Sequence, residues 1–313
     1  MQNSFDPYSH LLEGLQQKNI SGLTSEVQEK IVSAADFLFT NFSDHVEQQI
    51  DAAFAYYQAQ YPARAYRAIV NRIPNAGLPQ TLIAWILIKS FKDLDRETKR
   101  ILSDRTFSDS GIEQDILSGD LGQRLKDRSG EEEILGRVFI VGLANVCKCL
   151  ADFAKSGDED NVLLANGWIE KSLKLAIKVN DYQWYWRLEC ARLIVDEFVR
   201  NSLWHRLKPM RGEDVAGHFV EPYIKANLEP PNSVSELWRS QIEALDKVND
   251  PDRRSYCLKM PTSAGKTRIA ELMILRFLLD HENYPDAKCV YIAPLRSLAS
   301  DVWLSCITNL LLI

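Results

Sequence analysis

The chain has 313 residues, of which 46% are hydrophobic and 26% charged, as in ordinary soluble globular proteins. This length favours roughly two domains. The formal net charge of −6 excludes a small basic module that holds nucleic acid by bulk charge alone. The six Cys residues include no CxxC pair and no matching His cluster, which favours free thiols in a reducing, cytoplasmic compartment.

Neither a secretory leader nor a membrane span is expected. The opening MQNSFDPYSHLLEGL lacks a basic start followed by an apolar run. The apolar stretch ILGRVFIVGLANVCKCLADF is long enough to span a bilayer, but it contains Arg137, Lys148 and Asp152. We therefore expect a buried helix there, in a soluble protein that does not bind membranes.

Residues 1–206 are predicted to form a mainly α-helical domain. Apolar residues recur at helical spacing in SGLTSEVQEKIVSAADFLFTNF, where Thr24 is a suitable N-cap. The polar interval Ser103–Glu133 is expected to be a mobile connection with short helical pieces. From Glu133 to Leu207, amphipathic segments separated by short polar turns such as Asn180–Asp181 indicate helical hairpins. No fixed-period repeat recurs, so the prediction extends no further than an α-helical domain.

An aromatic cluster lies near the end of this region. Trp184, Tyr185, Trp186 and Trp204 could form a surface on which a peptide or a base stacks. Aromatic clusters more often belong to a hydrophobic core, and we favour that interpretation.

The composition changes after Leu207. Helix-breaking residues favour a linker over residues 207–233, followed by a second domain over residues 234–313. These residues are Pro209, Gly212, Gly217, Pro222, Pro230 and Pro231.

The second domain contains a candidate phosphate-binding loop. SYCLKM (Ser255–Met260) has the character of a buried strand, and RIAELMILRFLLD that of a helix. Between them, PTSAGKT must turn sharply, so that Gly265 allows close approach and successive N–H groups meet a polyphosphate at the helix N-terminus. Lys266 would reach the β- and γ-phosphates of ATP, and the Thr267 hydroxyl would ligate Mg²⁺. The candidate ATP-binding residues are Thr262, Ser263, Ala264, Gly265, Lys266 and Thr267.

Two motifs carry a family resemblance. The loop MPTSAGKT has Met260 where the general phosphate-loop pattern has a first Gly, and it resembles motif I of superfamily two helicases, often written A-P-T-x-x-G-K-T. KCVYIAPLRSLASDVW (Lys288–Trp303) is similar to motif Ia of Ski-two-like DExH helicases, close to APLRALA, whereas DEAD-box proteins usually have PTRELA. The chain thus resembles the N-terminal part of a Ski-two-like DExH/DEAD-box ATP-dependent helicase. The resemblance implies the start of an α/β RecA-like domain after the helical one.

The resemblance also implies roles for other residues. Gln241, in LWRSQIEAL, lies where such helicases often carry a glutamine that contacts adenine, although a surface glutamine is equally compatible with the sequence. The loop after the motif Ia strand would hold the sugar-phosphate backbone of nucleic acid without reading its sequence, with Arg296 neutralising a phosphate unless it is simply solvated. The matching residues are Pro294, Leu295, Arg296 and Ser297.

Motif II and later motifs are absent. Hydrolysis in this family needs the acidic pair of DExH and arginine fingers from a second RecA-like domain, so we name no catalytic residue and expect no ATP hydrolysis by this chain alone. The uncharged ending LSCITNLLLI is unlike the usual charged helix and suggests a truncated, frameshifted or excerpted helicase. The two predicted strands are too few to make a stable sheet.

Three functions remain after these observations. The first is the N-terminal part of an ATP-dependent nucleic-acid helicase that binds ATP and Mg²⁺. The second is a helical protein-interaction scaffold with a vestigial phosphate loop, whose partner would bind the helical domain. The third, a non-helicase ATPase or kinase, is disfavoured by IAPLRSLA. The sequence decides neither between RNA and DNA nor the direction of translocation.

Overall fold

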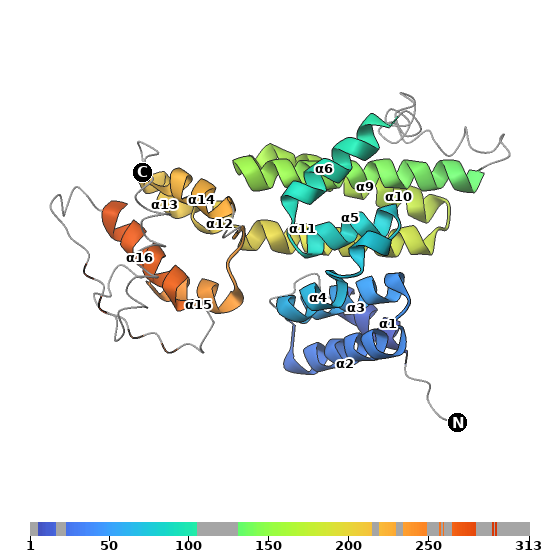
Figure 1. The fold of residues 1–313 in the computed structure, drawn as a ribbon, viewed down its shortest axis with the longest axis horizontal. Coiled ribbons are helices and arrows are strands. Elements are labelled where there is room, and N and C mark those ends of the chain that lie inside the picture. The colour runs from blue at the N-terminus through green and yellow to red at the C-terminus, as the bar shows by residue number, and fades with distance from the viewer. Residues whose placement is uncertain are drawn as a thin grey trace. The chain divides into compact units, whose positions relative to one another are not determined.

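The structure is a computed structural model that describes residues 6–16, 23–104, 131–214, 219–229, 234–248, 257, 259, 265–279, 290 and 292. The chain divides into two compact units, Met1–Glu197 and Phe198–Ile313 (Figure 1). The described residues are mostly helical and contain no strand. The predicted helical character of the N-terminal region is therefore confirmed.

The first unit consists of helices packed against their neighbours in sequence. Contacts join α1 to α2, α2 to α3 and α3 to α4, and further contacts place α5 and α6 against the long helix α9 (Figure 1). The elements are α1 (Pro7–Gln16), α2 (Ser25–Asn41), α3 (Val46–Gln58), α4 (Pro62–Ile69), the 3-10 turn η2 (Ile73–Asn75), α5 (Leu78–Leu87), α6 (Phe91–Ser103), α9 (Glu131–Ser156), α10 (Glu159–Lys178) and α11 (Tyr182–Asn201).

Local capping interactions set several of these helix boundaries. The Thr24 hydroxyl accepts a hydrogen bond from the N–H of Val27 at the start of α2, which confirms the predicted N-cap. Gly157 has φ +69° at the end of α9, and the Asp158 carboxylate then caps α10. Because only this short turn separates them, α9 and α10 pack against each other as a helical hairpin.

The aromatic cluster contributes to the core, as the sequence favoured. Trp184 is buried and stacks on Phe139 of α9, with ring centroids 5.0 Å apart. Trp204, in the second unit, is also buried. Trp186 is partly buried and donates a hydrogen bond from Nε1 to Asp51 Oδ1 over 3.0 Å. Trp184 and Trp204 therefore contribute to buried packing.

Asp51 of α3 is a carboxylate enclosed by helices of the first unit. Its second oxygen accepts a hydrogen bond from the Tyr8 hydroxyl over 2.9 Å, so both oxygens are bound by uncharged donors. Burial raises the pKa of Asp51 to about 6, although the hydrogen bonds from Trp186 and Tyr8 oppose the shift. The carboxyl therefore ionises at a pH well above its ordinary range.

Helix α9 contains the apolar stretch that the sequence placed inside the protein. Among the described residues, Ile134–Ser156 is long and apolar enough to cross a membrane, and 67% of its most apolar window is buried within the protein. Val138 and Val141 pack with Trp168 and Leu175 of α10. This packing is that of a core helix. Cys147, Cys149 and Cys190 are buried free thiols, and the described residues hold no cluster of metal-binding side chains.

The second unit contains α12 (Leu203–Arg206), α13 (Lys208–Glu213), α14 (Val220–Leu228), α15 (Arg239–Val248) and α16 (Lys266–Leu279). Residues 207–233, predicted as a linker, hold α13 and α14. Pro209 and Pro222 lie in the first turns of these helices, where the missing N–H has no intrahelical partner to lose. The unit boundary falls within α11, ahead of the predicted position.

Side-chain and backbone contacts fix α14 and the approach to α15. The Asp214 carboxylate accepts hydrogen bonds of 2.8 Å from the N–H groups of Phe219 and Val220, and so caps α14. An isolated antiparallel bridge joins Ser202 to Glu236. The residues that follow α11 therefore anchor the segment that leads into α15.

The predicted strands lie almost entirely outside the described residues. Within them, only Cys257, Lys259, Val290 and Ile292 are described, and all four are exposed and outside regular structure. The α/β start of a RecA-like domain therefore stays a prediction.

Candidate phosphate-binding site

Gly265 forms the turn that begins α16. Its φ is +77°, in the left-handed region that residues with a Cβ rarely adopt. Its carbonyl accepts hydrogen bonds from the N–H groups of Arg268 (3.1 Å) and Ile269 (3.4 Å), so Gly265 is the N-cap of α16. The next residues, Lys266 and Thr267, are exposed in the first turn. Their N–H groups have no acceptor within the helix and form the positive end of the helix dipole. This end of α16 suits an anion.

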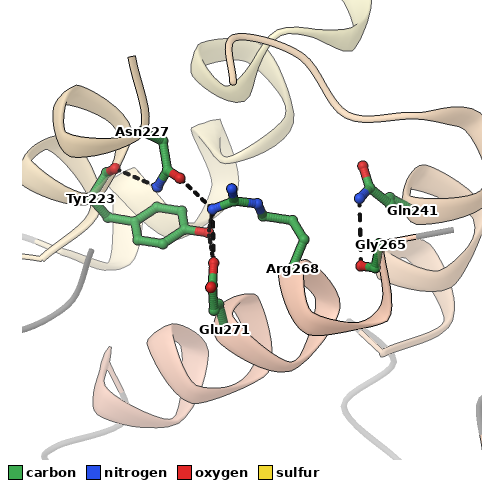
Figure 2. A network of polar contacts seen from close by, with 6 residues as sticks. All are labelled: Tyr223, Asn227, Gln241, Gly265, Arg268 and Glu271. Atoms are coloured by element: carbon green, nitrogen blue, oxygen red, sulfur yellow. Dashed lines mark hydrogen bonds and ion pairs between the residues drawn. The ribbon is translucent and has the colours of Figure 1, made fainter. Parts of the chain in front are cut away.

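Gln241 of α15 lies directly against this turn, 24 residues earlier in the chain (Figure 2). Its side chain is buried and its Nε2 lies 3.5 Å from the Gly265 carbonyl oxygen, at the limit of a hydrogen bond. Its Oε1 accepts a 2.9 Å hydrogen bond from the N–H of Trp238, the residue that precedes α15. This bond, from the N-cap N–H to the side chain of the third helical residue, is one of the two bonds of a capping box. Gln241 thus links the start of α15 to the start of α16.

Space at Gly265 is limited by the same glutamine. A Cβ built on Gly265 would lie 1.9 Å from Gln241 Nε2. Positive φ and close approach therefore both select glycine at this position. Behind the turn, Ala244 and Val248 of α15 pack with Ile269 and Met273 of α16 in an apolar cluster.

A buried polar network attaches α16 to α14 on another side (Figure 2). Arg268 Nη1 donates hydrogen bonds to the Tyr223 hydroxyl (3.0 Å), to Glu271 Oε2 (2.7 Å) and to Asn227 Oδ1. The Tyr223 hydroxyl in turn donates to Glu271 Oε2 over 3.3 Å. Asn227 Nδ2 donates to the backbone oxygen of Tyr223 over 2.8 Å. All four side chains therefore have partners, as buried polar groups require.

The electrostatics of this network favour a charged Arg268 and a neutral Tyr223. Tyr223, Asn227 and Glu271 are almost completely buried, and the Arg268 side chain is 12% exposed. Burial raises the pKa of Tyr223 above its ordinary value, while the guanidinium opposes this shift. Burial disfavours the charged form of Arg268, but Tyr223 and Glu271 outweigh it and raise the pKa of Arg268 overall.

The structure brings together only some of the predicted site residues. Gly265, Lys266, Thr267 and Gln241 meet at the start of α16. Thr262, Ser263 and Ala264 of the phosphate loop lie outside the described residues, as do Pro294, Leu295, Arg296 and Ser297 of the predicted nucleic-acid loop.

Sequence reasoning missed the network between α14 and α16. Tyr223 and Asn227 fell within the predicted linker. Arg268 and Glu271 gave a usable signal, because they form an oppositely charged pair three residues apart in α16, and Glu271 is the acidic residue of that helix.

Comparison with protein families identifies the class of this segment. Residues 238–309 match the family model described as DEAD/DEAH box helicase. They begin beside α15 and extend past α16, so they include Gln241 and the Gly265–Lys266–Thr267 turn. This match confirms the helicase resemblance that the two motifs of the sequence carry.

Two curated proteins extend the comparison. The chain is 31% identical to the Hachiman protein HamB of Bacillus cereus over 180 residues, covering 56% of this chain and 14% of that protein. It is 33% identical to the ATP-dependent DNA helicase Hel308 of Methanocaldococcus jannaschii over 69 residues, covering 22% of this chain and 6% of that protein. The HamB match is longer than the whole second unit and therefore includes part of the helical first unit. The chain thus spans a small fraction of the length of both relatives.

Proposed function

We propose that this chain is the N-terminal part of an ATP-dependent nucleic-acid helicase of Ski-two-like type, and that its second unit binds ATP with Mg²⁺. The observation that carries the proposal is the glycine turn at the start of α16, which presents Lys266 and Thr267 at a helix N-terminus beside Gln241. The family match over residues 238–309 and the similarity to Hel308 support helicase function.

The residues of this turn fit a magnesium–nucleotide ligand. Lys266 is exposed, so its ammonium is free to reach a β- or γ-phosphate. The Thr267 hydroxyl is exposed on the adjacent position, where a hard oxygen ligand suits Mg²⁺. ATP bound with Mg²⁺ supplies the phosphoryl-transfer chemistry of this class. The protein contributes the N–H groups, the helix dipole and the Lys266 charge that together orient the phosphates.

Gln241 is proposed to contact the adenine ring as well as the loop. Its amide already lies at the phosphate loop, so a base held beside α15 would meet the same side chain. Movement of the amide away from the Gly265 carbonyl would cost little, because that contact is long.

Hydrolysis is proposed to require parts beyond those recognised in this chain. Glu271 is the acidic residue of α16, but it is engaged with Arg268 and Tyr223 and is almost completely buried. It therefore does not serve as a water-activating base. We propose that the chain binds ATP without hydrolysing it, and that Arg296 and its neighbours supply the nucleic-acid contact. A cytoplasmic location is part of this proposal and is supported by the free thiols.

The test is nucleotide binding by the 313-residue chain, measured by titration with a fluorescent ATP analogue in the presence of Mg²⁺. The expected result is saturable binding that Lys266→Ala weakens at least about tenfold, since a charge-assisted phosphate contact is lost. Gln241→Glu keeps an oxygen to accept the Trp238 N–H but removes the amide donor. It is therefore expected to reduce the preference for ATP over GTP while leaving helix content unchanged.

A helical interaction scaffold is the second candidate. Leu163, Leu164 and Ile177 on α10 are 57–70% exposed, so this helix offers apolar side chains to a protein partner. Absence of ATP binding in the wild-type chain, or binding that Lys266→Ala leaves unchanged, would support the scaffold over the helicase. Anisotropy titrations with single-stranded RNA and DNA would then decide whether any nucleic-acid binding remains.

A further inference from the structure

The network between α14 and α16 is an unusual way to join two helices. Helix α16 already has a packed apolar side, where Ile269, Leu272 and Leu275 are completely buried. A buried charged pair contributes little net stability compared with apolar side chains of similar size, because both charges must be removed from water. Cohesion of the unit therefore does not explain why Arg268 and Glu271 are present.

The hydrogen bonds of Arg268 restrict the position of α16 more tightly than apolar packing does. Three acceptors from two helices surround one Nη1 group of Arg268, and each hydrogen bond tolerates only a limited range of distance and angle. Such contacts fix the rotation of α16 about its own axis and its translation along that axis relative to α14. Apolar side chains would permit small shifts at lower cost.

The location of Arg268 couples this geometry to the candidate phosphate site. Arg268 follows Thr267 directly and lies in the first turn of α16. Figure 2 shows the Arg268 side chain directed towards Tyr223 and Asn227. Gly265 and Gln241 lie at the N-terminal end of α16. The Nη1 group of the guanidinium is thus bound within the protein. A shift of this turn would nevertheless move Lys266 and Thr267.

We propose that Tyr223 and Asn227 of α14 are positioning residues for ATP binding, because their hold on Arg268 sets the first turn of α16. This inference rests on the proposed function of Lys266 and Thr267. It assigns a part of the nucleotide site to α14, which lies ahead of the segment matched by the helicase family.

The test measures the affinity of the full 313-residue chain for Mg²⁺–ATP, well below its melting temperature. Tyr223→Phe removes the hydroxyl and keeps the ring, and Asn227→Ala removes the second partner of Arg268. Each is expected to weaken binding by about 3- to 10-fold with helix content intact. Ile224→Val, a completely buried change on the same helix without a polar contact to α16, is the control. It is expected to lower the melting temperature and leave the affinity unchanged.

A second set of variants tests the same inference if the single substitutions unfold the second unit. The double variant Arg268→Met with Glu271→Leu replaces the buried charges with apolar groups, which proteins often tolerate. It is expected to fold and to bind Mg²⁺–ATP about tenfold more weakly. In that background Tyr223→Phe should change the affinity less than twofold, because the hydroxyl no longer has a guanidinium to hold.

The outcomes separate this inference from the proposed function. Wild-type binding that Lys266→Ala abolishes, but that Tyr223→Phe and Asn227→Ala leave unchanged, overturns the positioning role and preserves the ATP site. Equal losses of affinity in Tyr223→Phe and Ile224→Val also overturn it, since they indicate a general structural effect. A wild-type chain that does not bind Mg²⁺–ATP overturns both.

Discussion

Replacement of Gly265 by alanine tests the geometry of the α16 turn. Alanine at this position must adopt φ near +77°, and its Cβ would lie 1.9 Å from Gln241 Nε2. The glutamine amide is the end of a flexible side chain, so it can move aside. In moving, it loses contact with the Gly265 carbonyl and disturbs its hydrogen bond from the Trp238 N–H.

The expected cost has two parts. Left-handed backbone conformation costs an alanine about 1–2 kcal/mol relative to glycine. The lost capping hydrogen bond of Gln241 costs about 1 kcal/mol more. The sum, roughly 2–3 kcal/mol, is a large fraction of the stability of a small domain. Because one factor of ten corresponds to about 1.4 kcal/mol, opening of α16 should become on the order of 30- to 150-fold more frequent.

Amide hydrogen exchange of α16 measures this opening directly and avoids assuming that the two units unfold together. Gly212→Ala is the matched control, since a Cβ on that exposed helical glycine meets nothing within 4 Å. Gly212→Ala should leave the amide exchange of α16 unchanged or slow it slightly. In the Gln241→Ala background, Gly265→Ala should cost less than in the wild type, because the steric conflict is gone. Exchange of α16 as slow in Gly265→Ala as in the wild type, or fully additive effects, would refute the reasoning.

Three further perturbations address other contacts. Glu271→Ala leaves the buried charge of Arg268 without its carboxylate and should destabilise the second unit by about 3 kcal/mol in denaturant titrations. Glu221→Ala removes the exposed ion pair of Glu221 with Lys225 on α14 and should cost less than about 1 kcal/mol. Asp214→Ala removes the cap of α14 and should cost about 1 kcal/mol, seen as faster amide exchange in that helix, while equal exchange rates would show that the cap is unimportant. Because burial raises the folded-state pKa of Asp51 from 3.8 to about 6, the folded form binds more protons between these values, so stability should fall by about 2–3 kcal/mol as pH rises from 4 to above 6. Asp51→Asn should remove that part of the pH dependence, and an unchanged pH profile would contradict the assignment.

Much of the local structure could be predicted from sequence because its causes are local. Thr24 caps α2 through a residue three positions away, and Gly157 ends α9 by its own backbone conformation. The glycine turn ahead of Lys266 follows from the same kind of reasoning. The helicase resemblance of residues 238–309 also depended only on short motifs and their order.

Proline is an ambiguous signal of a helix boundary in this sequence. Pro209 and Pro222 end helices in most contexts, and so residues 207–233 resembled a linker. A proline in the first turn of a helix loses no hydrogen bond, and local sequence does not distinguish the two cases. Tertiary packing does, because Tyr223 becomes completely buried when α14 meets α16.

The sequence by itself indicated the helical first unit, the sharp turn at Gly265 and the helicase resemblance of the C-terminal segment. Only the tertiary structure decided that Gln241 lies against Gly265 and that Tyr223 and Asn227 hold Arg268. These partners are 24 and more than 40 residues apart in the chain. No periodicity or spacing rule reaches that far, because such contacts depend on how whole helices pack rather than on the residues between them.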